Sequence, residues 1–324
     1  QVVCERNPYY WKVDPEGRQL PYLDRLAFEV TNAETINLRA LNGELAMQER
    51  HIAFKNYPLL MEHRRAARAP YQVRHWFGGA GSAVMLNLNH RDPVLRELFG
   101  DRRFRIALSH AIDRDEVNRL LYFGVGQARQ VAPAPSSRFY LESQAKAHLA
   151  HDPAKAAALL DELGLRLGPD GERLRPDGQP LAVCIETMDM DTPIATLVAE
   201  YWTRVGVRST VKEEARQLFY ARKAAMLHDA CPTGAAGGEQ DPTLDPRHYF
   251  PAGHESNQAV GYAQWYVTHG AKGAQPPEPI RRCMEIFRAI EATPDLKEQA
   301  RPRRGRSGNR RARSPATCSR PPNR

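Results

Sequence analysis

The most informative stretch of this 324-residue chain is MLNLNHRDPVLRELFGDRRFRIALSHAIDRDE, residues 85–116. It joins a strand, an aspartate-capped turn and a helix. Residues 83–88 are rich in Val, Leu and Met, which predicts the strand. The helix is predicted from Asp101 to about Ile112, with an apolar stripe at Phe104, Ala107, Leu108 and Ala111. Asp113 is typical of an N-cap and predicts a second helix through Leu121.

Upstream of that stretch the sequence predicts a loop followed by short elements. Residues 6–24 are dense in Pro, Gly and aromatic residues, which indicates an ordered loop. Residues 25–30 alternate apolar and polar side chains, as a strand does. Helices are predicted over 34–45, where Asn42 and Gly43 are stop signals, and over 57–68. A further strand is predicted over 71–77.

Downstream, strands and helices alternate, which predicts an α/β lobe with a partly parallel sheet. Asp152 as N-cap, Pro153 at the first helical position and Gly164 as stop predict a helix over 152–163. Strands are predicted over 181–187 and 207–212, and helices over 193–205, 213–225 and 280–290. A Gly-rich stretch at 233–238 precedes an aromatic-rich loop that is expected to reach about Thr268.

The net charge of +8 comes from the last residues of the chain. Residues 301–324 hold 9 Arg and no acid, which leaves 37 basic against 38 acidic residues over 1–300. A folded nucleic-acid module carries its basic stripe on packed elements, so the near-neutral body argues against that class. We expect the tail to be disordered because it has no large apolar side chains to bury. A polyanion-binding arm and an out-of-frame reading of GC-rich DNA both stay open for it.

The five cysteines are scattered, odd in number and never in a C-x-x-C pair, which predicts no zinc or redox framework. No apolar run approaches the roughly 18 residues of a membrane span. The chain opens at Gln1 in patterned sequence without a signal peptide. We therefore expect it to be a fragment that lacks its true N-terminus.

Three segments resemble bacterial extracellular solute-binding proteins of family 5, the peptide-, opine- and nickel-type receptors of ABC importers. Residues 6–48 resemble the family's N-P-x-Y-W segment and the helix that ends in L-x-G-E, with Ala46 in place of the usual acid. Residues 85–116 resemble its strand, turn and A-I-D-R helix, and residues 152–228 resemble the element order of its second lobe. Together the matches cover residues 1–299.

The resemblance implies an α/β, two-lobed fold of the periplasmic-binding-protein type II, incomplete at the N-terminus and followed by a disordered basic tail. Residues 1–85 would form part of lobe one and residues 93–228 lobe two. The chain would cross between lobes at 86–92, return at 229–241, and complete lobe one with 242–299. Residues 300–324 would be the Arg-rich tail.

The function implied by the resemblance is capture of a small solute, such as a peptide, an opine or a sugar, in the cleft between the lobes. The closed, loaded protein would deliver the solute to the membrane subunits of an ABC permease, without a cofactor and as a monomer. The periplasm or a lipid-anchored position on the cell surface would be its location. A peptide-binding regulatory or chaperone-like relative is the alternative.

Asn87 and Asn89 occupy alternate positions of the predicted strand, so they would share one face of it. They are candidate ligand contacts, because amides both donate and accept hydrogen bonds. Capping of a turn and hydrogen bonds between lobes are the alternative roles. Trp76, which ends a predicted strand beside Gly78 and Gly79, is a further candidate.

The Gly-rich segment is the second candidate region, and its named members are Gly234, Gly237 and Gly238. In peptide-binding members of the family this region resembles G-W-x-A-D, in which the Trp lines the pocket and the Asp pairs with the ligand's amino group. Ala235 and Gly238 stand at those positions. Either Glu239 or Asp241 supplies the carboxylate that pairs with the ligand's amino group, or the ligand is not a peptide with a free amine. A flexible glycine hinge is the alternative.

Trp265 and Tyr266 lie in the predicted aromatic-rich loop and could stack on a sugar or a peptide plane, or simply pack. Trp202 is expected in the core, and His90 and His110 are expected to be structural. The group Asp241, Asp245, His248 and His254 matches no compact metal motif, so no metal site is predicted.

Catalytic signatures are missing from the sequence. The segment Gly79–Ala83 lacks the last glycine of a nucleophile elbow, and it leads into a strand rather than a dinucleotide-binding helix. No P-loop and no H-E-x-x-H motif occurs. We therefore expect a binding protein with no catalytic residues.

Overall fold

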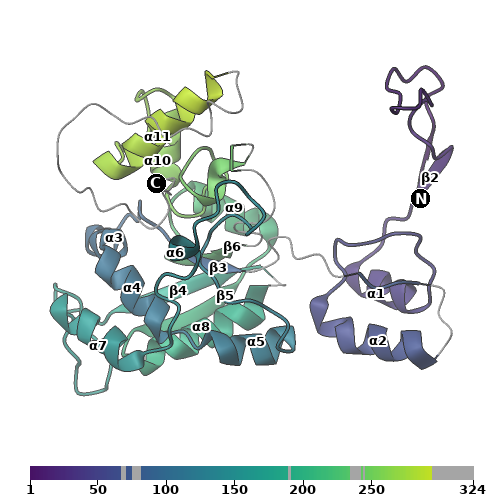
Figure 1. The fold of residues 1–324 in the computed structure, drawn as a ribbon. Coiled ribbons are helices and arrows are strands. Elements are labelled where there is room, and N and C mark those ends of the chain that lie inside the picture. The colour runs from purple at the N-terminus through teal and green to yellow at the C-terminus, as the bar shows by residue number, and fades with distance from the viewer. Residues whose placement is uncertain (67–70, 75–81, 189–190, 234–241, 244, 294–324) are drawn as a thin grey trace. The chain divides into compact units, whose positions relative to one another are not determined.

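A computed structural model describes residues 1–66, 71–74, 82–188, 191–233, 242–243 and 245–293. The chain divides into two compact units, Gln1–His75 and Trp76–Arg324 (Figure 1). The stretch over residues 85–116 lies within the second unit.

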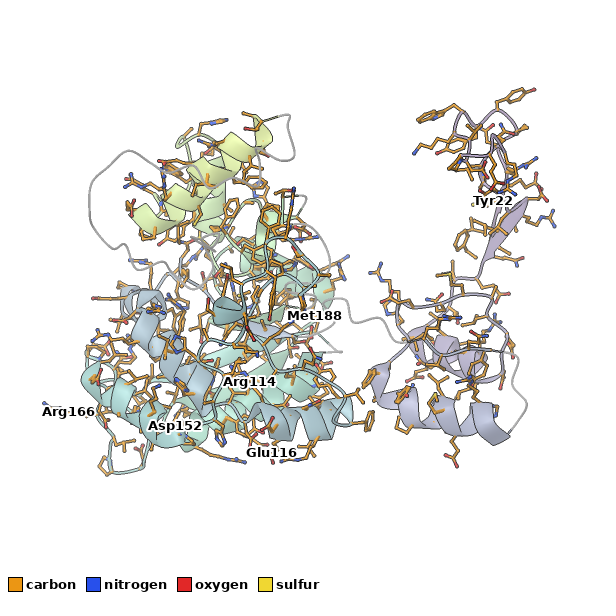
Figure 2. All side chains as sticks on the ribbon, viewed as in Figure 1. Tyr22, Arg114, Glu116, Asp152, Arg166 and Met188 are labelled. Carbon is orange, nitrogen blue, oxygen red and sulfur yellow. The ribbon has the colours of Figure 1, made fainter. Side chains whose placement is uncertain are left out.

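The first unit is a small antiparallel ribbon followed by a helical segment. Strand β1 (Val2–Glu5) pairs with β2 (Arg25–Phe28), and all eight strand residues are exposed. Asn32 caps α1 (Ala33–Leu41) by accepting a hydrogen bond from the backbone N–H of Thr35. The 3-10 helix η1 (Phe54–Asn56) leads into α2 (Tyr57–Ala66). The predicted ordered loop is present: Asp14 accepts hydrogen bonds from Arg18 and from the hydroxyl of Tyr22 (Figure 2).

The second unit is built on a four-stranded sheet with the order β3-β6-β4-β5. Strands β4 (Ala182–Thr187), β5 (Arg208–Glu213) and β6 (Ala230–Thr233) run parallel. Helices α8 (Thr192–Arg204) and α9 (Arg216–Ala224) connect them in turn. Strand β3 (Ala83–Leu86) pairs antiparallel with β6, with Leu86 opposite Ala230. This is the partly parallel α/β sheet that the sequence predicts.

Helices α3 (Pro93–Gly100), α4 (Arg102–Ala111) and α7 (Pro153–Glu162) contribute buried side chains to the main core, as α8 does. Helix α5 (Arg114–Tyr122) packs against α8, and the single helical turn α6 (Glu142–Ala145) follows α5 in the chain. Asp92, Asp101, Asp113 and Asp152 cap α3, α4, α5 and α7 through side-chain oxygens. The core includes Phe99, Phe104, Leu160, Ile185 and Trp202. A hydrogen bond from the Tyr201 hydroxyl to Glu116 joins α8 to α5; Glu116 is labelled in Figure 2.

The C-terminal part adds a second, smaller core. The 3-10 helix η3 (Pro246–His248), α10 (Val260–Val267) and α11 (Glu278–Glu291) follow β6, the last two drawn green to yellow (Figure 1). Phe250, Tyr266, Ile280 and Met284 are among the buried side chains of this cluster. Among the described residues, no helix combines the length and the apolar character that a membrane span needs.

Most predicted elements are present within a few residues of their predicted bounds. The predicted aromatic-rich loop is wrong at its end, because residues 260–267 form α10. The predicted strand over 71–77 is wrong over 71–74, which have no regular structure, and its remainder lies outside the described residues. Strand β6 lies within the predicted return crossover 229–241, and the sequence pattern did not indicate it. The tail over 300–324 lies outside the described residues, and the predicted lobe bounds stay a prediction.

A buried arginine ties three segments of the second unit together. The Arg173 side chain, 1% exposed, donates to Val205 O at 2.8 Å, Asp161 Oδ1 at 2.6 Å and Leu165 O at 2.5 Å. Gly206 lies directly against it with φ +87°, and a Cβ atom there would lie 2.9 Å from Arg173 Cγ. The close approach and the positive φ together require glycine at this turn.

Replacing Gly206 with alanine is expected to destabilise the second unit more than the same change at Gly164. Both glycines have positive φ, but a Cβ at Gly164 would meet nothing within 4 Å. Gly164→Ala carries the backbone strain alone, about 1–2 kcal/mol, whereas Gly206→Ala adds an overpacking cost of about 1–3 kcal/mol. Urea unfolding of both variants measures the difference. Equal losses would contradict the close approach.

Candidate functional site

The turn after β3 is held against the start of β6 by the buried side chain of Asn87. Asn87 is 0% exposed, and its Nδ2 donates to His228 O at 2.8 Å and to Met226 O at 3.2 Å. Its Oδ1 accepts from Asn89 N at 3.0 Å, and its backbone N–H donates to Asp229 O at 2.8 Å. The prediction that Asn87 and Asn89 share a strand face is wrong, since β3 ends at Leu86 and both residues lie beyond it.

Asn89 acts as a distant cap for α10. Its Oδ1 accepts from the backbone N–H of Tyr262, in the first turn of that helix, at 3.1 Å. The residue that precedes the helix, Ala259, makes no side-chain cap. Gly261 allows the approach, because a Cβ there would lie 3.1 Å from Asn89 Cγ. A free N–H at a helix start is thereby satisfied from the turn after β3.

His90 and Asp229 complete this turn. His90 Nδ1 accepts from Asp92 N at 3.0 Å, so its Nε2 carries the proton and donates to Asp229 Oδ1 at 2.9 Å. Asp229 Oδ2 accepts from Cys184 N in β4 at 2.8 Å. Both ring nitrogens of His90 are used in holding the structure, as the sequence predicts.

A cavity of about 250 Å³ lies where the parallel strands β4 and β6 end. Open α/β sheets bind ligands outside the carboxyl ends of their strands, so this is the place where the fold favours a site. Met188 follows β4, Pro232 belongs to β6, and α9 contributes two aromatic residues. Its lining consists of Met85, Met188, Asp191, Phe219, Tyr220, Pro232, Arg247, His248, Glu255, Asn257 and Gln258.

The charged groups of this cavity, Asp191, Arg247 and Glu255, all have protein partners, and the Glu255 carboxylate lies 4.0 Å from Arg247 Nη1. Asp191 Oδ1 accepts from Ser82 Oγ at 2.9 Å. Arg247 pairs with Asp245 at 2.6 Å, and this hydrogen bond raises the pKa of the guanidinium. Burial lowers the pKa of His248, which favours its neutral form. The amides of Asn257 and Gln258 and the Tyr220 ring therefore suit a polar, largely uncharged ligand.

Trp265 and Tyr266 belong to α10 and pack in the second core. The Tyr266 side chain is 8% exposed, with the Phe250 ring 6.0 Å away and the Arg288 guanidinium 4.5 Å from its centroid. Trp265 packs against the same cluster. Neither residue lines the cavity at the strand ends. Their role as ligand contacts stays a prediction.

The remaining predicted contacts lie outside the described residues; they are Trp76, Gly234, Gly237, Gly238, Glu239 and Asp241. All of them except Trp76 lie in the segment that begins after Thr233, the last residue of β6. For metal binding, no three His, Cys, Asp or Glu side chains come together anywhere in the described part of the chain. Asp245, from the group weighed as metal ligands, instead pairs with Arg247.

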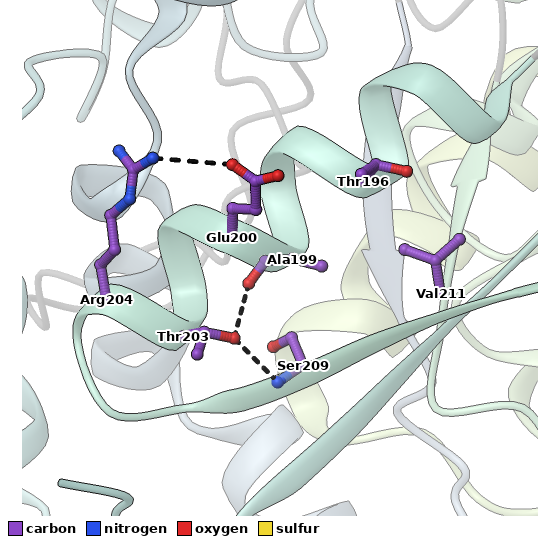
Figure 3. Close-up of a pocket in the computed structure, with 7 residues that line it drawn as sticks. All are labelled: Thr196, Ala199, Glu200, Thr203, Arg204, Ser209 and Val211. Carbon is purple, nitrogen blue, oxygen red and sulfur yellow. Dashed lines mark hydrogen bonds and ion pairs between the residues drawn. The ribbon is translucent and has the colours of Figure 1, made fainter.

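A second hollow, of about 460 Å³, opens between α8 and the sheet-edge strand β5 (Figure 3). Thr203 Oγ1 accepts from Ser209 N at 3.1 Å and donates to Ala199 O at 2.8 Å. Arg204 Nη2 lies 3.6 Å from Glu200 Oε2. Because these groups bond one another (Figure 3), the hollow offers a ligand few free partners.

The sequence patterns did not single out Tyr220, Lys223, Asp229 or Asn257. Lys223 and Asn257 hydrogen-bond each other across 34 positions, and Asp229 and His90 across 139. No local spacing encodes such pairs. The one available signal was the predicted return crossover, which begins at Asp229.

A sequence model of bacterial extracellular solute-binding proteins, family 5 Middle, matches residues 1–257. The periplasmic alpha-galactoside-binding protein of Rhizobium meliloti is 28% identical over 177 residues, which are 51% of this chain and 25% of that protein. A probable ABC transporter-binding protein of Deinococcus radiodurans is 24% identical and is matched over 65% of this chain and 37% of its own length.

Solved structures show the same fold. An oligopeptide-binding protein OppA superposes with a TM-score of 0.68 at 36% identity, over 92% of this chain and 50% of that one. The periplasmic binding protein MelB of Agrobacterium fabrum, in complex with stachyose, gives a TM-score of 0.70 at 20% identity, over 92% and 46%. The chain thus spans about half the length of these structures and less of the curated relatives.

Asn87→Asp is expected to destabilise the protein by about 3–5 kcal/mol at pH 7, because it sets a buried carboxylate against two carbonyl oxygens. Burial raises the pKa of the new acid, so the loss shrinks at low pH, where the protonated carboxyl can donate once. Asn89→Asp is the matched control. Asn89 accepts a hydrogen bond through its side-chain oxygen, and the new carboxylate would face the N-terminus of α10, where a negative charge is favourable. Urea unfolding between pH 3 and 7 measures both. A larger loss at Asn89 would contradict the assigned donor role.

Proposed function

Because the chain belongs to family 5 of the bacterial extracellular solute-binding proteins, we propose that it captures a small solute for an ABC importer. The observation that carries the proposal is the polar cavity at the carboxyl ends of β4 and β6. Family members are extracellular or periplasmic receptors, and the relatives reported above are substrate-binding proteins rather than enzymes.

The proposed solute is a peptide or a related small molecule such as an opine or a sugar. Relatives are named for oligopeptides and for alpha-galactosides, and both ligand types present many carbonyl or hydroxyl oxygens. The cavity offers the complementary groups, two amides and the Tyr220 ring, with Asp191 and Arg247 engaged by protein partners. Such a lining supports recognition by hydrogen bonds and stacking.

Delivery to permease subunits, from the periplasm or from a lipid-anchored position at the cell surface, completes the proposed role. Solute binding would stabilise the closed arrangement of the two lobes, which the permease then recognises. The lobe bounds proposed for this motion are those implied by the sequence, with crossings at 86–92 and 229–241. No cofactor takes part in this cycle.

Titration calorimetry with a tetrapeptide, stachyose and an opine tests the proposal. We expect saturable binding of one class, and at least a tenfold loss of affinity in Tyr220→Ala and in Asn257→Ala, because both side chains line the cavity. Thr196→Ala, in the open hollow beside β5, is the matched control and should bind as the unaltered protein does. Absence of saturable binding in the whole panel would contradict the function, and a loss confined to Thr196→Ala would move the site.

A further inference from the structure

Lys223 is a buried cation that the proposed function leaves unexplained. It lies on the last turn of α9 and is 2% exposed. Its Nζ donates to Asn257 Oδ1 at 3.1 Å and to Glu255 O at 3.4 Å, and it lies 4.8 Å from the centroid of the Tyr220 ring. Among the described residues no carboxylate comes within ion-pair distance of it. Burying an ammonium group with neutral partners alone costs free energy, so a further role would account for its presence.

The contact with Lys223 fixes which way the Asn257 amide faces. An ammonium group has only donors, so the amide atom beside it must be the oxygen. The Asn257 backbone is held as well, because His228 Nε2 lies 2.9 Å from Asn257 O and must donate to that carbonyl. With the residue held at both ends, the Nδ2 group is directed away from Lys223.

Asn257 also lines the cavity at the strand ends, and within the described residues its Nδ2 has no hydrogen-bond acceptor. Lys223 itself is not part of the lining. Lys223 can therefore act on a ligand only through the lining residues that it contacts, Tyr220, Glu255 and Asn257, and of these Asn257 is the one whose side-chain amide it orients.

We propose that Lys223 is a positioning residue that holds the Asn257 amide with its N–H group toward the cavity. The site then selects solutes that place an oxygen acceptor, a carbonyl or a hydroxyl, at this point. This inference rests on the proposed function and adds the specificity-determining pair to it. Without Lys223 the amide can rotate by half a turn, because its oxygen and nitrogen differ little in size, and the cavity then presents an acceptor instead of a donor.

A double-mutant cycle tests the contact without any ligand. Asn257→Asp keeps the shape and replaces the amide by a carboxylate that pairs with the ammonium group. We expect Asn257→Asp to retain the melting temperature of the unaltered protein, and to lower it in a Lys223→Met background, where the carboxylate has no cation. Equal effects of Asn257→Asp in both backgrounds would overturn the proposal.

A second experiment measures the affinity of each variant for the solute identified by calorimetry. Asn257→Asp should bind it at least tenfold more weakly despite undiminished stability, since the donor is lost. Lys223→Met should weaken binding at least threefold, Lys223→Arg should restore most of the loss, and Lys223→Met should add little to Asn257→Asp. Unchanged affinity in Lys223→Met would overturn the positioning role. If the unaltered protein binds no solute in the panel, the proposed function fails. The double-mutant cycle still shows whether Lys223 and Asn257 interact.

Discussion

One buried amide, that of Asn87, joins the parts of the second unit that surround the candidate site. It binds the turn after β3 to the carbonyl groups of Met226 and His228, just before β6 begins. The neighbouring Leu88 donates to Gln258 O, and Asn89 caps α10. The chain leaving α9, the strand β6 and the segment before α10 are thus placed by a single turn. Of these, β6 contributes Pro232 to the cavity at the strand ends, and the segment before α10 contributes Asn257 and Gln258.

The polar character of this turn has a physical consequence. An apolar side chain at position 87 would leave two buried carbonyls without donors, which costs more than a hydrogen bond contributes on average. A satisfied polar contact also requires one relative placement of its partners, whereas apolar packing tolerates several. Directed hydrogen bonds also connect this turn to β4, because His90 donates to Asp229 and Asp229 accepts from the backbone N–H of Cys184. The arrangement favours a cavity of fixed shape within this unit, suited to recognition by a small number of directed hydrogen bonds.

Elements with local signals were predictable from the sequence, and those held by distant contacts were not. The aspartates that cap α4, α5 and α7 precede helical stripes that were predicted, whereas α3 lies in a segment predicted as a turn. Helix α10 lacks such a signal, because Ala259 cannot cap it and Asn89, 173 positions before Tyr262, does so instead. The same limit applies to the site. Asn87 and Asn89 were predicted as ligand contacts, with turn capping as the alternative role, and in the structure their side chains hold the turn after β3 and cap α10. The Lys223–Asn257 pair could be identified only from the fold.

We propose that solute is held where β4 and β6 end, against α9 and the segment that Asn87 and Asn89 position. Hydrogen exchange measured by mass spectrometry, with and without saturating solute, would locate the bound solute. If solute is held there, exchange becomes slower in residues 216–224 and 255–262 on binding and does not change in residues 196–211 around the open hollow. Slower exchange confined to 196–211, or none at 255–262 with solute bound, would contradict it.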